Sequence, residues 1–88
     1  MVTIEGLRFT PGTLIVTRGE RVTWVNKDPF PHTVTDDNKA FDSGKLAPDV
    51  SWSFVARSPG TYTYGCSLHP TMKGTLIVKP PAHLGDRK

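Results

Sequence analysis

The sequence has only one cysteine in 88 residues, so no disulfide bond can form within the chain. A domain of this size lies near the lower limit of what a hydrophobic core stabilises without disulfides or metals. Either the core is sufficient by itself, or a bound metal ion adds to the stability of the folded state. The lone cysteine, Cys66, is accordingly either a free thiol or a metal ligand.

Long apolar runs and strong charge are also missing, and each absence excludes a class of protein. No apolar stretch approaches the length of a membrane-spanning helix. Lys and Arg exceed Asp and Glu by only 11 to 8, which is too weak and too scattered an excess for a nucleic-acid-binding protein. This mild positive charge suits a soluble protein whose partner has an acidic patch.

The amino end lacks a signal-peptide pattern. Met1 is followed directly by Val-Thr-Ile-Glu, without a basic segment or a long apolar core. Two interpretations are open at this point: a cytosolic protein, or a mature or truncated domain with a new start methionine.

Helical periodicity is hard to find, whereas runs rich in Val, Ile, Thr, Trp, Tyr and Phe recur roughly every 8–12 residues. Gly6 interrupts the first run and predicts a bulge there, and the Arg18-Gly19-Glu20 turn predicts a hairpin between the second and third runs. Seven or eight short strands with Pro- and Gly-rich turns predict an all-β fold, a Greek-key β-sandwich. An immunoglobulin-like binding module would show the same pattern, so the fold alone does not determine the function. The predicted strands are 2–9, 13–17, 21–26, 32–35, 51–55, 61–66 and 74–79.

The segment between the last two predicted strands carries three residues that can bind a metal. Cys66, His69 and Met72 follow one another at intervals of three, so a loop that folds back on itself can direct all three side chains to one point. Thiolate and thioether ligands select copper, and a trigonal nitrogen-and-sulfur site with a weak axial methionine describes a blue-copper electron-transfer centre. Taken singly, these residues are better explained as a small buried hydrophobe, a surface histidine and core packing. Their occurrence together favours a metal site.

A blue-copper site needs a second imidazole, and two further histidines are available. His83 lies in the tail beyond two consecutive prolines, where anchoring is poor. His32 follows the segment Asp28-Pro29-Phe30-Pro31, which two prolines stiffen, and it is predicted to open a short strand. A strand-end histidine that faces water is the ordinary alternative, but the need for an imidazole near Cys66 favours His32 as a ligand.

Two segments of the chain resemble the ligand-bearing motifs of the cupredoxins. Residues 24–34, which end in Pro-His-Thr-Val, are similar to the segment with the upstream histidine, and residues 59–74 are similar to the downstream ligand loop. The spacing Cys-x-x-His-x-x-Met resembles amicyanin and pseudoazurin more than plastocyanin. The resemblance covers about residues 13–79.

The resemblance implies a type 1 copper site and a function in electron transport. Single electrons would pass between redox partners through Cu(I)/Cu(II) cycling, and the protein would not itself be an enzyme. The backbone N–H of Thr33 is implied as a hydrogen-bond donor to the thiolate, and Asn26 is predicted as a further supporting residue. The implied ligands of one copper per chain are His32, Cys66 and His69, equatorial, and Met72, axial.

The partners implied by the resemblance are redox proteins that dock transiently around His69. The predicted docking patch consists of four apolar residues, Phe30, Pro31, Leu68 and Pro70. Cupredoxins act outside the cytoplasm, typically in the bacterial periplasm, which favours the interpretation as a mature or truncated domain. We expect a monomer with a single domain at residues 1–80 and a frayed polar tail at residues 81–88.

Two departures from the family pattern leave other hypotheses open. Gly65 stands where relatives usually have a larger residue, and the chain is shorter than most stand-alone members, so it could be one domain of a larger redox protein. A copper carrier would use the same ligands but release the metal readily. A catalytic copper domain would need an open position or a second copper site with additional histidines, and only His83 is left over. A metal-free interaction module would not respond to copper at all, and zinc would also bind these ligands.

Overall fold

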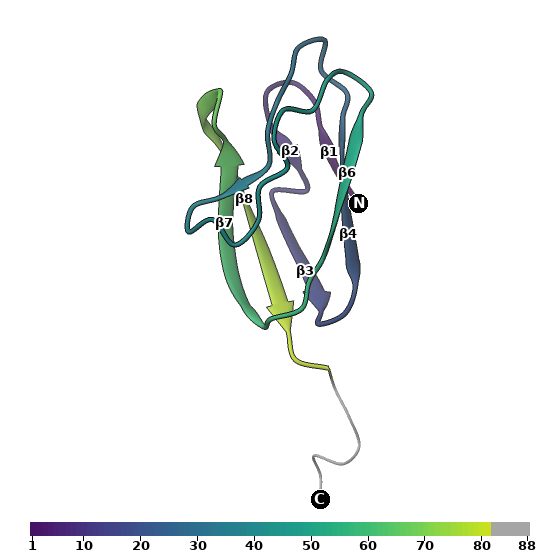
Figure 1. The fold of residues 1–88 in the computed structure, drawn as a ribbon, viewed down its shortest axis with the longest axis vertical. Helices are drawn as coiled ribbons and strands as arrows, with labels where there is room; N and C mark the ends of the chain where they lie inside the picture. Colours follow the sequence, from purple (N-terminus) through teal and green to yellow (C-terminus); the bar gives the residue numbers. More distant parts are fainter. Residues whose placement is uncertain (82–88) are drawn as a thin grey trace, which may run out of the picture.

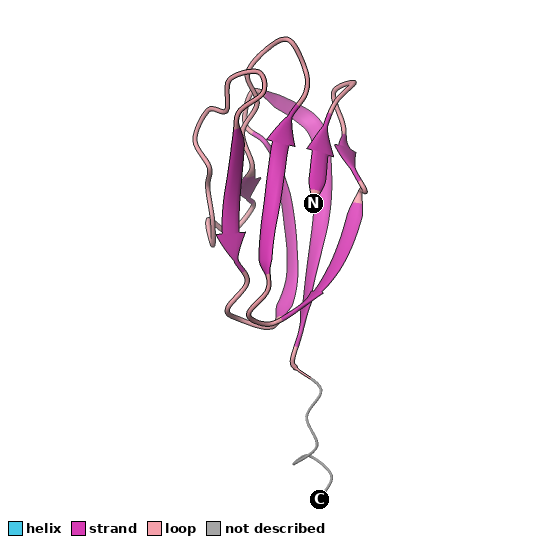
Figure 2. Ribbon diagram, turned by 90° about the vertical axis from the view of Figure 1, so that its right-hand side faces the viewer, coloured by secondary structure: helices cyan, strands magenta, loops and turns pink. Residues whose placement is uncertain are grey.

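Alternating apolar and polar residues form eight β-strands, which pack face to face as two four-stranded sheets (Figure 1, Figure 2). This computed structural model describes residues 1–81; of the predicted frayed tail, residues 82–88 lie outside the described range. In the described part of the chain, no helix could cross a membrane. The predicted all-β sandwich of seven or eight strands is confirmed. The strands are β1 (Val2–Ile4), β2 (Phe9–Thr10), β3 (Thr13–Thr17), β4 (Arg21–Asn26), β5 (Thr35–Asp36), β6 (Ser51–Val55), β7 (Gly60–Cys66) and β8 (His69–Lys79).

The first sheet has the strand order β2-β1-β4-β6. Strand β1 runs parallel to β4, with Ile4 opposite Asn26, and β4 runs antiparallel to β6. Along β4 the side chains of Val22, Trp24 and Asn26 are buried, as the alternation in the sequence predicts. The ring of Trp24 packs edge-on against Tyr64 of the other sheet, with 5.5 Å between the ring centroids. This contact joins the two sheets at the centre of the core.

The second sheet has the strand order β3-β8-β7-β5. Strand β3 runs parallel to β8, and β7 runs antiparallel to both β8 and β5. The turn between β7 and β8 lies at the end of the sandwich opposite Lys79 (Figure 1). The long connection between β5 and β6 buries Phe41 and Leu46 in the core.

The predicted hairpin between residues 13–17 and 21–26 is wrong, although both strands form with the predicted bounds. Strands β3 and β4 lie in different sheets. The turn between them crosses from one sheet to the other: the N–H of Arg18 bonds to Lys79 and that of Gly19 bonds to Ala56. A strand pattern determines which residues face the core, but it does not determine the partner strand.

Two other predicted strands are shorter than expected. The run 2–9 forms two strands joined by a tight turn rather than one bulged strand, because Gly6 and Leu7 both have left-handed backbone conformations, with φ of 65° and 60°. The predicted strand 32–35 is reduced to β5 and to a single bridge between His32 and Leu46. His32 is therefore held by this single bridge rather than by a regular ladder of strand hydrogen bonds.

Candidate metal centre

Strands β7 and β8 form a tight hairpin that holds two of the predicted ligands side by side. Cys66 and His69 are paired across the turn, and Ser67 and Leu68 make the turn itself. The sequence predicted a loop as far as Gly74, but β8 already begins at His69. The antiparallel pairing therefore fixes the separation of Cys66 and His69 more firmly than a loop would.

A bulge next to this turn buries Met72. Gly65 pairs with Lys73, but the next residue on β7, Cys66, pairs with His69, so residues 70–72 have no partner on β7. Met72 is buried within this bulge, while its neighbours on both sides are exposed. Gly65 permits the close approach of the strands here, because a Cβ atom at this position would lie 2.7 Å from the backbone oxygen of Met72.

The stiff loop between β4 and β5 holds His32 with its ring fully buried, at 0% exposure. Its backbone N–H bonds to the oxygen of Leu46 at 3.1 Å, and the N–H of Leu46 bonds back at 2.7 Å. The ordinary alternative for His32, a strand-end histidine facing water, is therefore wrong.

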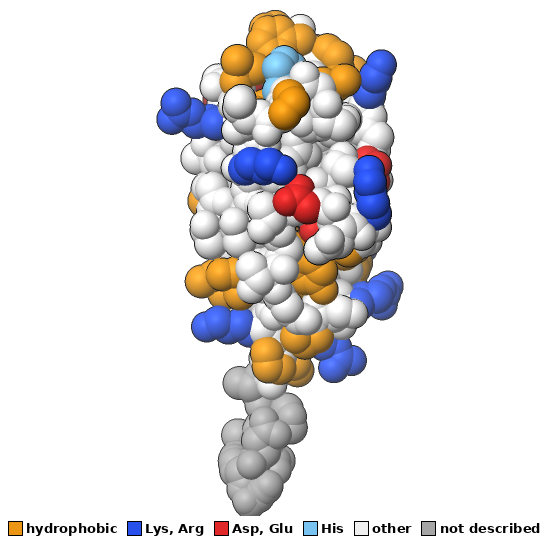
Figure 3. All heavy atoms as spheres, turned by 90° about the vertical axis from the view of Figure 1, so that its left-hand side faces the viewer, with side chains coloured by type: hydrophobic (Ala, Val, Ile, Leu, Met, Phe, Trp, Pro, Cys, Tyr) orange, Lys and Arg blue, Asp and Glu red, His pale blue; other side chains and the backbone are white. Residues whose placement is uncertain are grey.

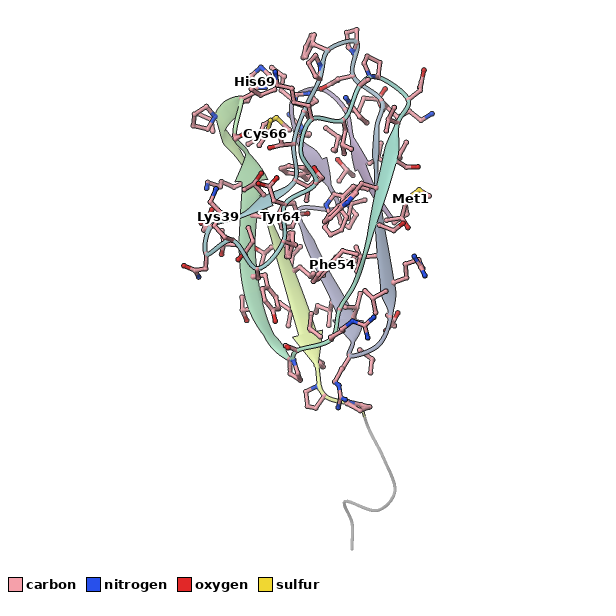
Figure 4. The ribbon with its side chains drawn as sticks, viewed as in Figure 1. Met1, Lys39, Phe54, Tyr64, Cys66 and His69 are labelled. Carbon is pink, nitrogen blue, oxygen red and sulfur yellow. The ribbon has the colours of Figure 1, made fainter. Side chains whose placement is uncertain are left out.

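The donor atoms of His32, Cys66 and His69 converge. The distance from Cys66 Sγ to His32 Nδ1 is 3.5 Å, and that to His69 Nδ1 is 3.8 Å. All three donor atoms lie within 4.8 Å of one another. Figure 4 shows Cys66 and His69 together at the end of the sandwich where the β7–β8 turn lies. The remaining histidine, His83, lies outside the described residues.

Thr33 bonds to the thiol through its backbone, as the family resemblance implies. Its backbone N–H donates to Cys66 Sγ at 3.3 Å. Its side-chain oxygen accepts the N–H of Ser67 at 2.8 Å, which ties the loop of His32 to the β7–β8 turn. Through these two bonds Thr33 fixes the relative position of the two ligand-bearing segments.

Asn26, the other predicted supporting residue, braces the loop before His32. Its side-chain nitrogen donates to the backbone oxygens of Phe30 and Leu46, both at 2.9 Å, and its side-chain oxygen accepts the N–H of Asp28. These three bonds satisfy a fully buried amide and hold the loop in one shape. Asn26 therefore acts on His32 through the loop and not by direct contact.

Asp28 is a residue of the site that the sequence did not reveal. Its Oδ2 lies 2.7 Å from His32 Nε2, the ring nitrogen that points away from Cys66. Burial would raise the pKa of this carboxyl, but the N–H groups of Leu7 and Gly6 and the His32 ring outweigh it and lower the pKa. The one available signal was an acidic residue four positions before a candidate ligand in a proline-stiffened loop.

The predicted docking patch surrounds the half-buried ring of His69. Phe30 is 40% exposed and Leu68 is 42% exposed, and Pro31 and Pro70 are exposed as well. The rings of Phe30 and His69 lie 6.0 Å apart. Figure 3 shows hydrophobic side chains gathered around a histidine at this end of the molecule. The imidazole is thus the polar member of an apolar surface.

The donor set itself fits a soft or borderline metal ion. Two imidazole nitrogens and one thiolate in a largely buried pocket suit copper or zinc, and a buried thioether in the adjacent bulge favours copper. Thr33 bonds to the thiol and Asp28 bonds to the His32 ring, while Asn26 braces the loop that carries His32. Such surrounding contacts are typical of sites that orient their ligands before a metal binds.

Comparison with known proteins gives consistent matches along almost the whole chain. Residues 1–78 match the family model described as a cupredoxin-like domain. Plastocyanin of Scenedesmus fuscus is 36% identical over 86 residues, covering 83% of this chain and 88% of that protein. Amicyanin-alpha of Methylorubrum extorquens is 31% identical over 83 residues, covering 89% of this chain and 70% of that protein.

Solved structures match the fold equally well. The Cu(I) form of an amicyanin mutant superposes with a TM-score of 0.83 at 28% identity, covering 89% of this chain and 79% of that one. A copper-containing nitrite reductase from Thermus scotoductus SA-01 superposes with a TM-score of 0.85 at 30% identity and covers 92% of this chain. Only 22% of the nitrite reductase chain is matched, so the similar part is one portion of a larger enzyme.

Proposed function

The chain belongs to the cupredoxin family, and on this premise we propose that it is a type 1 copper protein that carries single electrons between redox partners. The observation that carries the proposal is the convergence of one thiol and two imidazoles within 4.8 Å at a largely buried site. Its relatives plastocyanin and amicyanin support electron transport rather than catalysis. Bound copper would supply the redox chemistry by cycling between Cu(I) and Cu(II).

His32, Cys66, His69 and Met72 would hold the copper. The thiolate of Cys66 would provide the strongest bond, and the thioether of Met72 would be a weak donor that adjusts the reduction potential. The N–H of Thr33 withdraws electron density from the sulfur, which favours the reduced state. Because the fold holds these residues in place, little rearrangement would accompany the gain or loss of an electron by the bound copper.

Electrons would enter and leave at the docking patch. His69 is the ligand that reaches the surface, and the apolar residues around it exclude water from a contact with a partner. A patch of this small size supports brief docking of a redox protein rather than a permanent complex. We therefore expect a monomer in solution, with docking that depends on Phe30 and Leu68.

The domain and its location follow the same family logic. We propose that residues 1–80 form one cupredoxin domain that works outside the cytoplasm, as an electron carrier and not as an enzyme by itself. The match to part of a nitrite reductase supports one alternative, in which such a domain belongs to a larger redox protein. A copper carrier with the same ligands is the other alternative, and retention of Cu(I) separates it from an electron carrier.

Titration of the purified metal-free chain with Cu(II) tests the site. We expect an intense visible band from sulfur-to-copper charge transfer that saturates at one copper per chain. Cys66→Ser should abolish the band and leave the circular dichroism of the fold unchanged, whereas Leu68→Ala, two residues further along the same turn, should retain the colour. An intensely coloured Cys66→Ser protein would show that the thiolate is not a ligand.

A further inference from the structure

The carboxylate of Asp28 is buried, at 5% exposure, and fully partnered. Its Oδ1 accepts the N–H of Gly6 at 2.7 Å. Its Oδ2 accepts the N–H of Leu7 at 3.0 Å and lies 2.7 Å from His32 Nε2. One carboxylate therefore connects the β1–β2 turn to a predicted copper ligand: Leu7 and His32 are 25 residues apart in the sequence.

The β1–β2 turn is shaped to hold this carboxylate ionised. Gly6 and Leu7 both have left-handed φ values, and their successive N–H groups point to the two carboxylate oxygens. Two backbone donors compensate for the burial of the charge, so the carboxylate keeps its acceptor character without binding a proton. A leucine in the left-handed region is unfavourable, and the contact with Asp28 is the interaction that this conformation makes possible.

An ionised carboxylate can only accept hydrogen bonds, and this determines where the proton of a neutral His32 ring lies. Nε2 must carry it and donate it to Asp28. The lone pair is then on Nδ1, the nitrogen that lies 3.5 Å from Cys66 Sγ. The other tautomer would place two lone pairs against each other at Nε2 and turn an N–H toward the metal position.

We propose that Asp28 is the positioning residue of the metal centre, which fixes the tautomer and the ring orientation of His32 and anchors this ligand to the β1–β2 turn. The effect on copper rests on the proposed function; the tautomer of His32 in the metal-free protein does not. The negative charge of Asp28 would also make the His32 imidazole a stronger electron-pair donor to the metal, which would stabilise Cu(II) relative to Cu(I).

Asp36 provides a matched control. It is also a buried aspartate, at 2% exposure, and its Oδ2 also accepts two backbone N–H groups, those of Asn38 and Ala40. Among residues 1–81, the hydrogen bonds of its carboxylate are local to the turn after β5 and do not include an imidazole. Asp28→Asn and Asp36→Asn should therefore cost similar amounts of folding stability, and only Asp28→Asn should change the metal centre.

The experiment compares the 88-residue wild type, Asp28→Asn and Asp36→Asn in two measurements. The first is the long-range ¹H–¹⁵N correlation spectrum of the His32 ring in the metal-free protein, at a pH where the ring is neutral. We expect the proton on Nε2 in the wild type and in Asp36→Asn. A proton on Nδ1 in the wild type would overturn the proposal.

The second measurement is Cu(II) affinity by competition with a chelator. We expect Asp28→Asn to bind Cu(II) about 10–100-fold more weakly than the wild type, with a raised reduction potential, and Asp36→Asn to match the wild type. Equal losses in both variants would make Asp28 a support of the fold only. If the wild type gives no charge-transfer band, the proposed function fails, while the ring spectrum still tests the tautomer. If Asp28→Asn does not fold, the wild-type ring spectrum decides the question.

Discussion

His32 lies on a loop that the protein braces from several directions, whereas His69 lies at the open end of a hairpin. The buried ring of His32 is held by Asp28, and its backbone is paired with Leu46. The ring of His69 is half-buried within the docking patch. His69 is the first residue of β8 and directly follows a two-residue turn. Two predicted ligands of the same chemical type are thus held by different numbers of contacts.

This difference separates two tasks within one site. The braced loop restricts the position of the His32 ring, because Asp28 bonds to this ring, Asn26 bonds to Leu46, and Thr33 bonds to Cys66. The hairpin places the thiol next to that ring and leaves the His69 imidazole partly exposed to solvent. A site for electron transfer needs both a geometry that does not change and a path to the surface.

Removing each imidazole in turn should give the largest difference in stability between the His32 and His69 positions. We expect His32→Ala to destabilise the metal-free protein by about 2–4 kcal/mol, because it leaves a cavity and removes one of the three hydrogen bonds to the buried Asp28 carboxylate. His69→Ala should cost less than about 1 kcal/mol, because its side chain is partly exposed. Urea unfolding of the two metal-free variants measures the difference.

Adding free imidazole to the same two variants, now loaded with copper, gives a second test of the difference. It should restore the visible band of copper-loaded His69→Ala, because solvent reaches that position, and it should not restore the band of His32→Ala. Equal stability losses and equal rescue in both variants would show that the two histidines are held alike.

Gly65→Ala should have a smaller effect, confined to the hairpin. Its new Cβ would lie 2.7 Å from the backbone oxygen of Met72, so the bulge must shift, at a cost of about 1–3 kcal/mol. The charge-transfer band should shift as well, because the same bulge positions the axial thioether. Gly12→Ala is the control, since its nearest neighbour, the oxygen of Phe9, is 4.0 Å away. Thermal unfolding and the visible spectrum check this, and a Gly65→Ala protein indistinguishable from Gly12→Ala would contradict it.

The sequence predicted the parts of the molecule that local patterns determine. Strands β3, β4 and β6 have the predicted bounds, because each is a short run rich in β-branched and aromatic residues that is bounded by turn or loop residues. The chemistry of Cys66, His69 and Met72 indicated a metal, and the structure brings the thiol together with His32 and His69. Their assignment as copper ligands stays a prediction until the metal is measured.

The parts that were missed depend on contacts between distant residues. The partner strands of β3 and β4 are determined by how the sheets stack, which a local turn such as Arg18-Gly19-Glu20 does not reveal. Asp28 was missed because its role depends on the Gly6 and Leu7 amides, which are 22 and 21 residues away. A left-handed leucine has no signature in the sequence pattern.

Reversible redox titration of the copper-loaded wild type, in the presence of a Cu(I) chelator, tests electron transport most directly. We expect a single one-electron transition per chain, in which the visible band disappears on reduction and returns fully on oxidation, with the copper still bound. Loss of Cu(I) to the chelator during the cycle, or failure of the band to return, would contradict electron transport and favour a copper carrier.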